Sequence, residues 1–414
     1  MKNKQSAYGI CAVVITVLII LSAFVFDSSA RIGEAQSANY SLSVIEEKEK
    51  MPYMYLVNKI EKDFLFQFFL FKKANVKNGK YIYTDANGTE VVFTVNPEVQ
   101  KQIEREFKRY RLEYGAFVAI EPSTGKVVTA VSSVDYPDLT IKNTFVAAST
   151  FKIITAAAAL ENSINPNKNL VTRGHDDSCS PTVWFNSKYI IYRNMFHSFA
   201  YSSNPYFGVV GKLLGEKKLL DFASIFGFNR NDYNFPWGTV RKPLDDFDLA
   251  LTAAGLGETR VSPFHEALIS ATIENGGVMI LPFLVEEVRY KGNTVYEHKS
   301  PVVLRKTINK KTADTIKRMM LGTVRFGTAS GKKFFKKIRR RSSLKMGGKT
   351  GTLSQLNFPE GRCEWFTGFV EDGDKKIAIA SVAVNDARYY ITGYDLSALA
   401  VLTMLKSDYL FAKR

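Results

Sequence analysis

Strand patterns stand at both ends of this chain, and helical patterns fill the middle. Hairpin patterns occupy 80–95 and 116–131, and an Ala-rich helical pattern follows at 149–161. Two more apolar strand patterns, 365–370 and 377–384, come near the C-terminus. Strands at both ends with helices between them predict an α+β fold, or a mixed sheet that is closed by the first and last strands.

Composition excludes several classes of protein. The 414 residues are 46% hydrophobic and 23% charged, which is typical of a chain with a packed core. Three Cys residues are too few for a disulfide scaffold, and no Cys/His cluster predicts a structural zinc site. The net charge of +16 leaves nucleic acid, a membrane surface or an acidic polymer as partners.

The N-terminus predicts a membrane anchor. The stretch from Gln5 to Phe26 has no charged residue, and it is long enough to span a bilayer as a helix. Two lysines precede it, so we expect residues 1–7 in the cytoplasm, an anchor over 8–26 and a polar stalk over 27–52.

A cleaved signal peptide is the alternative for this segment. Ser28-Ser29-Ala30 fits a cleavage site, although the apolar run is longer than usual in signal peptides. In either case most of the chain is exported, to the side of the membrane away from the cytoplasm. We therefore expect no nucleic-acid partner.

The pattern Ser-x-x-Lys occurs four times, and one copy opens an apolar helix. Ser149 lies at the start of the predicted helix, and Lys152 falls on the same helix face, within reach of the serine oxygen. A lysine in an apolar site has a lowered pKa and can act as a base toward a hydroxyl. Taken alone, the pattern also fits a capping serine and a solvent-exposed lysine. The other copies are Ser123/Lys126, Ser330/Lys333 and Ser342/Lys345.

Two further short motifs follow. Ser202 and Asn204 form Ser-x-Asn, where the hydroxyl suits proton relay and the amide suits a substrate amide. Lys349-Thr350-Gly351 follows two glycines and offers a cation and a hydroxyl for a carboxylate. Each motif alone is weak evidence, because turn-rich loops have similar compositions.

Together, in this order, the three motifs resemble the signature of penicillin-binding proteins and serine β-lactamases. The resemblance covers roughly residues 96–405, with one departure: Ala147-Ala148 stands where the family often has Pro-Gly. Further blocks of the penicillin-binding type are Gly115–Ser132, Ala254–Gly257, Val261–Pro263, Asn275–Gly277 with Pro282, and Glu364–Phe369.

The resemblance implies a fold. We expect an antiparallel sheet flanked by helices, with a mostly helical subdomain, over residues 111–414. A small N-terminal pedestal over 53–110 would precede it. This pedestal leaves no room for the large glycosyltransferase domain of the bifunctional class, so we expect a monofunctional, class B type protein, although that group often has a larger N-terminal module.

The resemblance also implies the roles of the site residues. Ser149 would be the nucleophile and Lys152 the base, while Ser202 and Lys349 would relay protons. The backbone N–H groups of Ser149 and Thr352 would form the oxyanion hole. The substrate-binding residues would be Asn204, Thr350, Gly351 and Thr352, with no metal and no cofactor.

The implied activity is that of a peptidoglycan D,D-transpeptidase inhibited by β-lactams. Its expected partners are peptidoglycan stem peptides, β-lactam antibiotics, the membrane and a cell-wall synthesis complex. A D,D-carboxypeptidase shares every motif. A β-lactamase is a further alternative, although the Glu-x-x-Leu-Asn and Tyr-Gly-Asn elements of two β-lactamase classes are not found. A β-lactam sensor and a non-catalytic scaffold complete the alternatives.

Four other features lie outside the three motifs. The segment between Gly327 and Gly348 is strongly basic, which fits a solvated surface or an anchor for acidic wall polymer or lipid headgroups. Cys179 and Cys363 either pair or stay separate. His265 is expected to be a packed or capping residue, and Asp176-Asp177 a loop.

Overall fold

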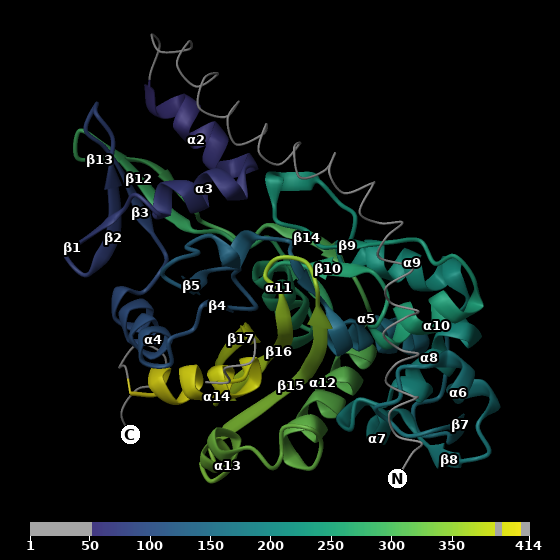
Figure 1. The fold of residues 1–414 in the computed structure, drawn as a ribbon. Helices are drawn as coiled ribbons and strands as arrows, with labels where there is room; N and C mark the ends of the chain where they lie inside the picture. Colours follow the sequence, from purple (N-terminus) through teal and green to yellow (C-terminus); the bar gives the residue numbers. More distant parts are fainter. Residues whose placement is uncertain (1–51, 386–390, 407–414) are drawn as a thin grey trace. The chain divides into compact units, whose positions relative to one another are not determined.

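The computed structural model describes residues 52–385 and 391–406, and a five-stranded antiparallel sheet lies at its centre (Figure 1). The sheet order is β15-β16-β17-β4-β5, so strands from the two ends of the chain meet at the β17–β4 pair. The α+β prediction and the sheet shared by first and last strands are confirmed. The strands are β4 (Tyr114–Ile120), β5 (Val127–Ser132), β15 (Leu344–Gln355), β16 (Gly361–Asp372) and β17 (Lys375–Asn385).

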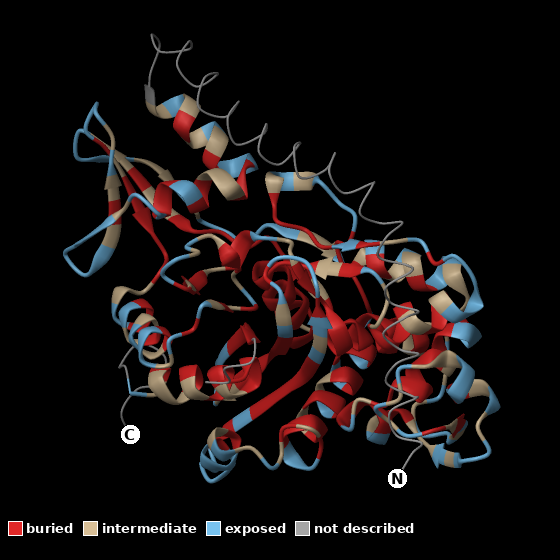
Figure 2. Cartoon of the chain, in the orientation of Figure 1, coloured by how far each residue is buried: buried red, intermediate tan, exposed pale blue. Residues whose placement is uncertain are grey.

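Helices cover both faces of this sheet. Successive strand residues face opposite sides, so Ile377 and Ile379 of β17 join the core beneath three helices on one face. Helix α11 packs on the other face, against β4, β16 and β17. Figure 2 shows the buried layer running through the centre of the molecule. The helices of the first face are α4 (Pro97–Arg109), α13 (Lys333–Arg339) and α14 (Gly393–Met404), and α11 is Pro263–Glu274.

A helical lobe adjoins β15. Helix α12 packs along this strand, and α5 packs against α8, α9, α10 and α12. The β7–β8 ribbon joins the lobe through contacts with α6 and α8. The elements of the lobe are α5 (Lys152–Glu161), β7 (Leu170–Arg173), α6 (Pro181–Asn186), β8 (Ile190–Arg193), α7 (Met195–Ala200), α8 (Asn204–Leu214), α9 (Glu216–Ile225), α10 (Asp246–Ala254) and α12 (Lys310–Arg325).

A second five-stranded sheet combines two distant parts of the chain. Its order is β1-β2-β3-β12-β13, so the segment predicted as a pedestal supplies three strands and residues 285–297 supply two. Helix α4, which falls within the predicted pedestal, packs in the core of the main sheet. The elements here are α2 (Pro52–Lys62), α3 (Phe64–Phe71), β1 (Asn75–Lys77), β2 (Lys80–Thr84), β3 (Thr89–Phe93), β12 (Val285–Tyr290) and β13 (Asn293–Glu297).

Short pairs and turns complete the connections. The predicted Asn87-Gly88 turn joins β2 to β3, with Gly88 at φ 79°. The predicted helix start is also confirmed, because the Asn96 side chain accepts a hydrogen bond from the Val99 N–H at the start of α4. The remaining strands are β6 (Phe145–Val146), β9 (Thr239–Val240), β10 (Thr259–Val261), β11 (Val278–Ile280) and β14 (Val303–Lys306), and the 3-10 helices are η1 (Leu139–Ile141), η2 (Ala148–Phe151) and η3 (Asp232–Asn234).

The predicted anchor at 8–26 lies outside the described residues. Among residues 52–385 and 391–406, no helix has the length and apolar character needed to cross a bilayer. The cytoplasmic tail and the stalk lie outside the described part as well.

Candidate active site

The nucleophile candidate lies at the junction of two helices. Ser149 belongs to the one-turn helix η2, which runs directly into α5 at Lys152. Ala148, just before the serine, takes a left-handed backbone conformation with φ 51°, which is unfavourable for a residue with a Cβ. A strained residue next to a candidate nucleophile indicates that the surrounding structure imposes the turn. The predicted helix at 149–161 therefore begins with a 3-10 turn.

Lys152 is fully buried and contacts the nucleophile. Its Nζ lies 2.6 Å from Ser149 Oγ and 2.7 Å from Asn204 Oδ1. Burial lowers the pKa of Lys152 to about 7, while the nearby Cys179 and Asp176 side chains oppose this shift. Roughly half of the Lys152 side chains are therefore neutral at pH 7, and a neutral amine can take the serine proton.

A second lysine faces the same site from the sheet. Lys349 of β15 is fully buried, and its Nζ donates to Ser202 Oγ at 2.8 Å and to the Thr350 carbonyl at 2.9 Å. Burial and then the positive charge of Lys152 hold the pKa of Lys349 well below its usual value. Ser202 takes φ 61° in the loop between α7 and α8, which aims its hydroxyl at β15. Two lysine–serine pairs thus stand in one site.

Asn204 contacts the buried lysine through its amide side chain. Its Oδ1 accepts from Lys152, and its Nδ2 donates to the Ser178 carbonyl at 3.2 Å. Its backbone N–H also donates to the Asp176 carbonyl at 2.8 Å. These bonds orient Asn204 beside Lys152, and its substrate-binding role stays a prediction.

Two hydroxyls meet beside the β15 motif, and the sequence motifs predict only one of them. Thr350 Oγ1 lies 2.6 Å from Thr328 Oγ1, and Thr328 had no signal of its own in the basic segment. Thr352 is exposed on the same strand. Gly351 packs closely, because an added Cβ would lie 3.2 Å from both Thr150 Cγ2 and Trp365 Cβ. A side chain at this position would force η2 or Trp365 to shift by a few tenths of an ångström.

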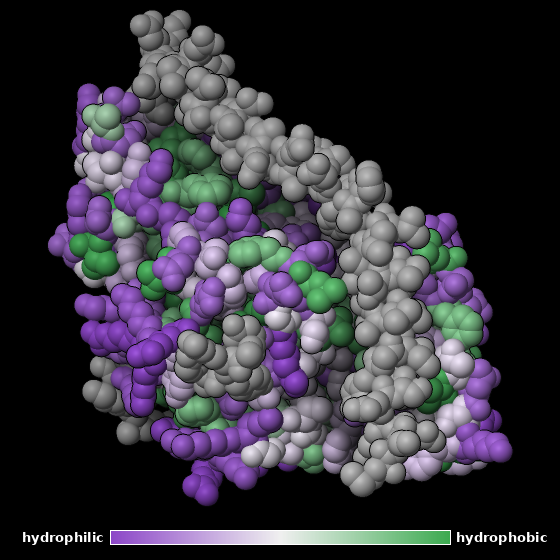
Figure 3. Space-filling view, in the orientation of Figure 1, coloured by the Kyte–Doolittle hydropathy of each residue, from purple (hydrophilic) through white to green (hydrophobic). Residues whose placement is uncertain are grey.

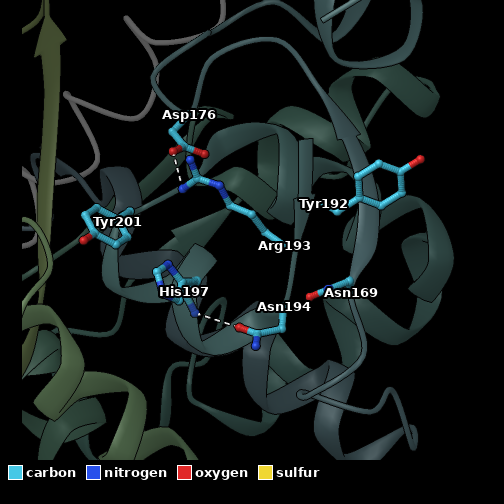
Figure 4. A pocket seen from close by; sticks show the side chains of 7 residues that line it. All are labelled: Asn169, Asp176, Tyr192, Arg193, Asn194, His197 and Tyr201. Carbon is cyan, nitrogen blue, oxygen red and sulfur yellow. Dashed lines mark hydrogen bonds and ion pairs between the residues drawn. The ribbon is translucent and has the colours of Figure 1, made fainter. Parts of the chain in front are cut away.

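A polar pocket lies behind the Ser202–Asn204 element (Figure 4). It has a volume of about 480 Å³, and Asp176 and Arg193 form an ion pair of 2.6 Å at its side. The Asp176 carbonyl holds Asn204, so this wall also supports the site. The Asp176-Asp177 loop prediction is confirmed. The lining residues are Asn169, Asp176, Tyr192, Arg193, Asn194, His197 and Tyr201.

The remaining candidates have structural roles. His265 is fully buried, as predicted for a packed residue, and burial lowers its pKa to about 4. Its ring accepts from the Gly238 N–H at 2.8 Å. No disulfide joins Cys179 and Cys363, and Cys363 is buried in β16. Within the described ranges, no group of three or more His, Cys, Asp or Glu side chains is arranged to hold a metal ion.

Comparison with known proteins agrees with this geometry. Residues 115–400 match the penicillin-binding protein transpeptidase domain family. The peptidoglycan D,D-transpeptidase PbpA of Mycolicibacterium smegmatis is 25% identical over 369 residues, covering 76% of this chain and 71% of that protein. The family match covers most of the chain, which therefore belongs to the penicillin-binding protein transpeptidase family.

Solved structures share the fold. The crystal structure of PBPA from Mycobacterium tuberculosis superposes with a TM-score of 0.65 at 21% identity, over 78% of this chain and 84% of that one. The imipenem acyl-enzyme complex of penicillin-binding protein A from the same organism gives a TM-score of 0.65 at 22% identity, over 77% and 80%. The predicted transpeptidase fold is thus confirmed.

Proposed function

We propose that the chain is a peptidoglycan D,D-transpeptidase that works through a serine acyl-enzyme. The observation that carries this proposal is the 2.6 Å contact between Ser149 Oγ and the fully buried Lys152. Such a pair needs no metal or cofactor to activate the hydroxyl. The family, the fold and the name of the M. smegmatis relative support the same activity.

The first half-reaction forms an ester. Neutral Lys152 takes the proton of Ser149 Oγ, and the oxygen attacks the carbonyl carbon of the penultimate D-Ala of a stem peptide. The peptide bond to the terminal D-Ala breaks, and its nitrogen leaves as an amine after receiving a proton. Ser202 Oγ, held by Lys349 Nζ at 2.8 Å, is placed to relay that proton.

Electrostatic contacts complete the proposed site. The backbone N–H groups of Ser149 and Thr352 would stabilise the oxyanion of the tetrahedral intermediate. The Thr350 and Thr328 hydroxyls, 2.6 Å apart, offer donors for the terminal carboxylate of the substrate. In the second half-reaction, the amine of a neighbouring stem attacks the ester, and Ser149 recovers its proton.

The acceptor separates this function from its alternatives. The full-length protein is incubated with a donor peptide ending in D-Ala-D-Ala and with an acceptor amine, and the products are separated by chromatography. We expect a cross-linked product that is absent with Ser149→Ala. Hydrolysis without cross-linking at every acceptor concentration would assign the chain to the carboxypeptidases instead.

We further propose a single-pass membrane location, with residues 8–26 as the anchor and the catalytic part outside the cytoplasm. This proposal rests on the uncharged apolar run and the two lysines before it. It is tested by washing membranes with alkaline carbonate, which should leave the protein in the pellet. Release of a protein shortened by about 30 residues would support the cleaved signal peptide.

The basic segment supplies the proposed contact with acidic wall polymer or lipid. Phe335 and Ile338 bury the apolar side of α13, so its lysines face outward, and Figure 3 shows hydrophilic side chains gathered over this region at the lower left. Arg339 differs, because it donates to the Val324 and Ser330 carbonyls. We expect salt-sensitive binding to anionic vesicles or wall fragments, reduced severalfold by Lys336→Gln with Lys337→Gln. Unchanged binding would mean that the basic segment is only a solvated surface and does not anchor polymer or lipid.

A further inference from the structure

A buried acid lies directly behind the nucleophile. Glu266 is in the first turn of α11 and is only 1% exposed, and its Oε1 lies 2.6 Å from Thr150 Oγ1. Thr150 follows Ser149 in η2 and is buried as well. The acid therefore contacts the turn that presents Ser149. None of the three motifs includes it.

The two short contacts of the Thr150 hydroxyl indicate that this acid is protonated. Thr150 Oγ1 also lies 2.6 Å from the Ala147 carbonyl oxygen, which can only accept. The threonine hydroxyl has one proton, and the Ala147 carbonyl takes it. A second contact of 2.6 Å is then a hydrogen bond only if the carboxyl of Glu266 donates. The chain of bonds runs from Glu266 to Thr150 to Ala147, and it needs the neutral acid.

The electrostatic environment agrees with a neutral acid. Burial raises the pKa of Glu266 to about 8. The Thr367 hydroxyl itself donates to the backbone carbonyl of Glu266 at 2.8 Å. Burying a carboxylate without a neighbouring cation carries a large free-energy cost.

The neighbouring charged groups are engaged elsewhere. Lys152 and Lys349 bond Ser149 and Ser202, and His265 turns to the Gly238 N–H. On β16, burial raises the pKa of the Cys363 thiol, so it stays neutral. Other charged groups around α11 are Glu364, which pairs with Arg362; Arg260 beside Cys363; Arg305, which lies near His265 and pairs with Asp232; and Glu274, which pairs with Lys317 and Lys376 and lies near Glu371.

We propose that Glu266, as a neutral acid, is a positioning residue that holds the Ala147–Thr150 turn and so keeps Ser149 Oγ on Lys152. Ionisation of Glu266 would reverse the bond: the carboxylate accepts the Thr150 proton, and the Ala147 carbonyl loses it. The left-handed Ala148, at φ 51°, then lacks one of the contacts that impose its strain. This inference rests on the proposed acylation of Ser149.

The sign of the pH effect follows. The neutral acid predominates below about pH 8, and acylation needs it, so the acylation rate should fall as pH rises past about 8. Below this range the rate should rise with pH through about 7, as Lys152 loses its proton. The two groups together predict a bell-shaped profile.

Substitution by glutamine tests the proposal with the full-length protein. The amide of Glu266→Gln can donate to Thr150 but cannot titrate, so the penicillin acylation rate at pH 7 should stay within about threefold of wild type and the fall above pH 8 should disappear. Glu274→Gln, a buried acid on the same helix, is the matched control and should keep the fall. Glu266→Gln with an unchanged alkaline fall would overturn the proposal.

An infrared difference spectrum gives an independent readout. Wild type minus Glu266→Gln at pH 6.5 should show the carbonyl stretch of a protonated carboxyl, which should vanish near pH 9.5. A carboxylate band at pH 6.5 would overturn the proposal even if the variant lost activity for structural reasons. If penicillin acylates the wild type, the proposed function stands whatever these tests show for Glu266. The role of Glu266 and the acylation of Ser149 can therefore fail separately.

Discussion

At the scale of single residues, two buried lysines share one site with a serine each. Their proximity disfavours two positive charges, so one lysine is readily neutral at physiological pH. Lys152 contacts Ser149, and Lys349 contacts Ser202 on the opposite wall. Under the proposed function, one lysine would abstract the serine proton, and the other would serve the proton relay and the substrate carboxylate.

Removal of the Lys152 amine tests this division. Lys152→Met keeps the bulk of the side chain but cannot accept a proton, so the acylation rate by penicillin should fall about 10³-fold. Thermal unfolding of the variant serves as the check on folding. An acylation rate within tenfold of wild type, with the same pH profile below 8, would contradict the role of Lys152 as the base.

At the scale of elements, the site depends on close packing between η2 and the end of α10. Gly255 caps α10 at φ 78°, and a Cβ there would lie 1.9 Å from the Ala148 carbonyl oxygen. No side chain fits without moving the turn that carries Ser149. The glycine was noted in the sequence, but its contact with η2 was not.

Gly255→Ala should therefore displace η2, lower the stability by about 3 kcal/mol and reduce acylation more than 100-fold. Gly88→Ala is the matched control, because Gly88 has φ 79° and nothing lies within 4 Å of an added Cβ. It should cost about 1 kcal/mol, from backbone strain alone, and leave acylation unchanged. Equal losses in both variants, measured by urea unfolding, would contradict the packing argument.

At the scale of the whole molecule, a buried amide ties helix α3 to the second sheet. Gln67 of α3 accepts from the Leu284 and Val285 N–H groups at 2.7 and 3.1 Å and donates to the Ile60 carbonyl at 2.7 Å. These bonds connect a helix before the main domain to a segment that is more than 200 residues later. Thr94 continues the connection to the main sheet, because its N–H donates to the Leu284 carbonyl and its hydroxyl donates to the Val127 carbonyl of β5, both at 2.8 Å.

Gln67→Ala should leave two buried N–H groups unpaired and destabilise the protein by about 3 kcal/mol. Gln102→Ala is the control, because the Gln102 amide bonds only Glu98 on the surface of α4. If the second sheet unfolds together with the main one, calorimetry should show a single transition that shifts as a whole. A separate early transition in Gln67→Ala would contradict this coupling.

Sequence reasoning located the elements and the motif residues because both depend on local patterns. Strand alternation, the Asn96-Pro97 start and the Asn87-Gly88 turn act within a few residues. The roles of Glu266 and Gln67 could not be predicted in this way. Their partners lie 116 and 217 residues away in the chain, and a polar residue in a helix pattern is most simply taken as exposed.

The proposed serine acyl-enzyme is tested most directly by fluorescent penicillin labelling of the full-length protein beside the Ser149→Ala variant. Labelling is followed over hours, together with the intact mass of the protein. We expect one covalent adduct that persists in the wild type and is absent from the folded Ser149→Ala variant. A transient adduct with consumption of the drug would indicate a β-lactamase. An adduct of equal yield in Ser149→Ala, or none in folded wild type, would contradict the serine acyl-enzyme.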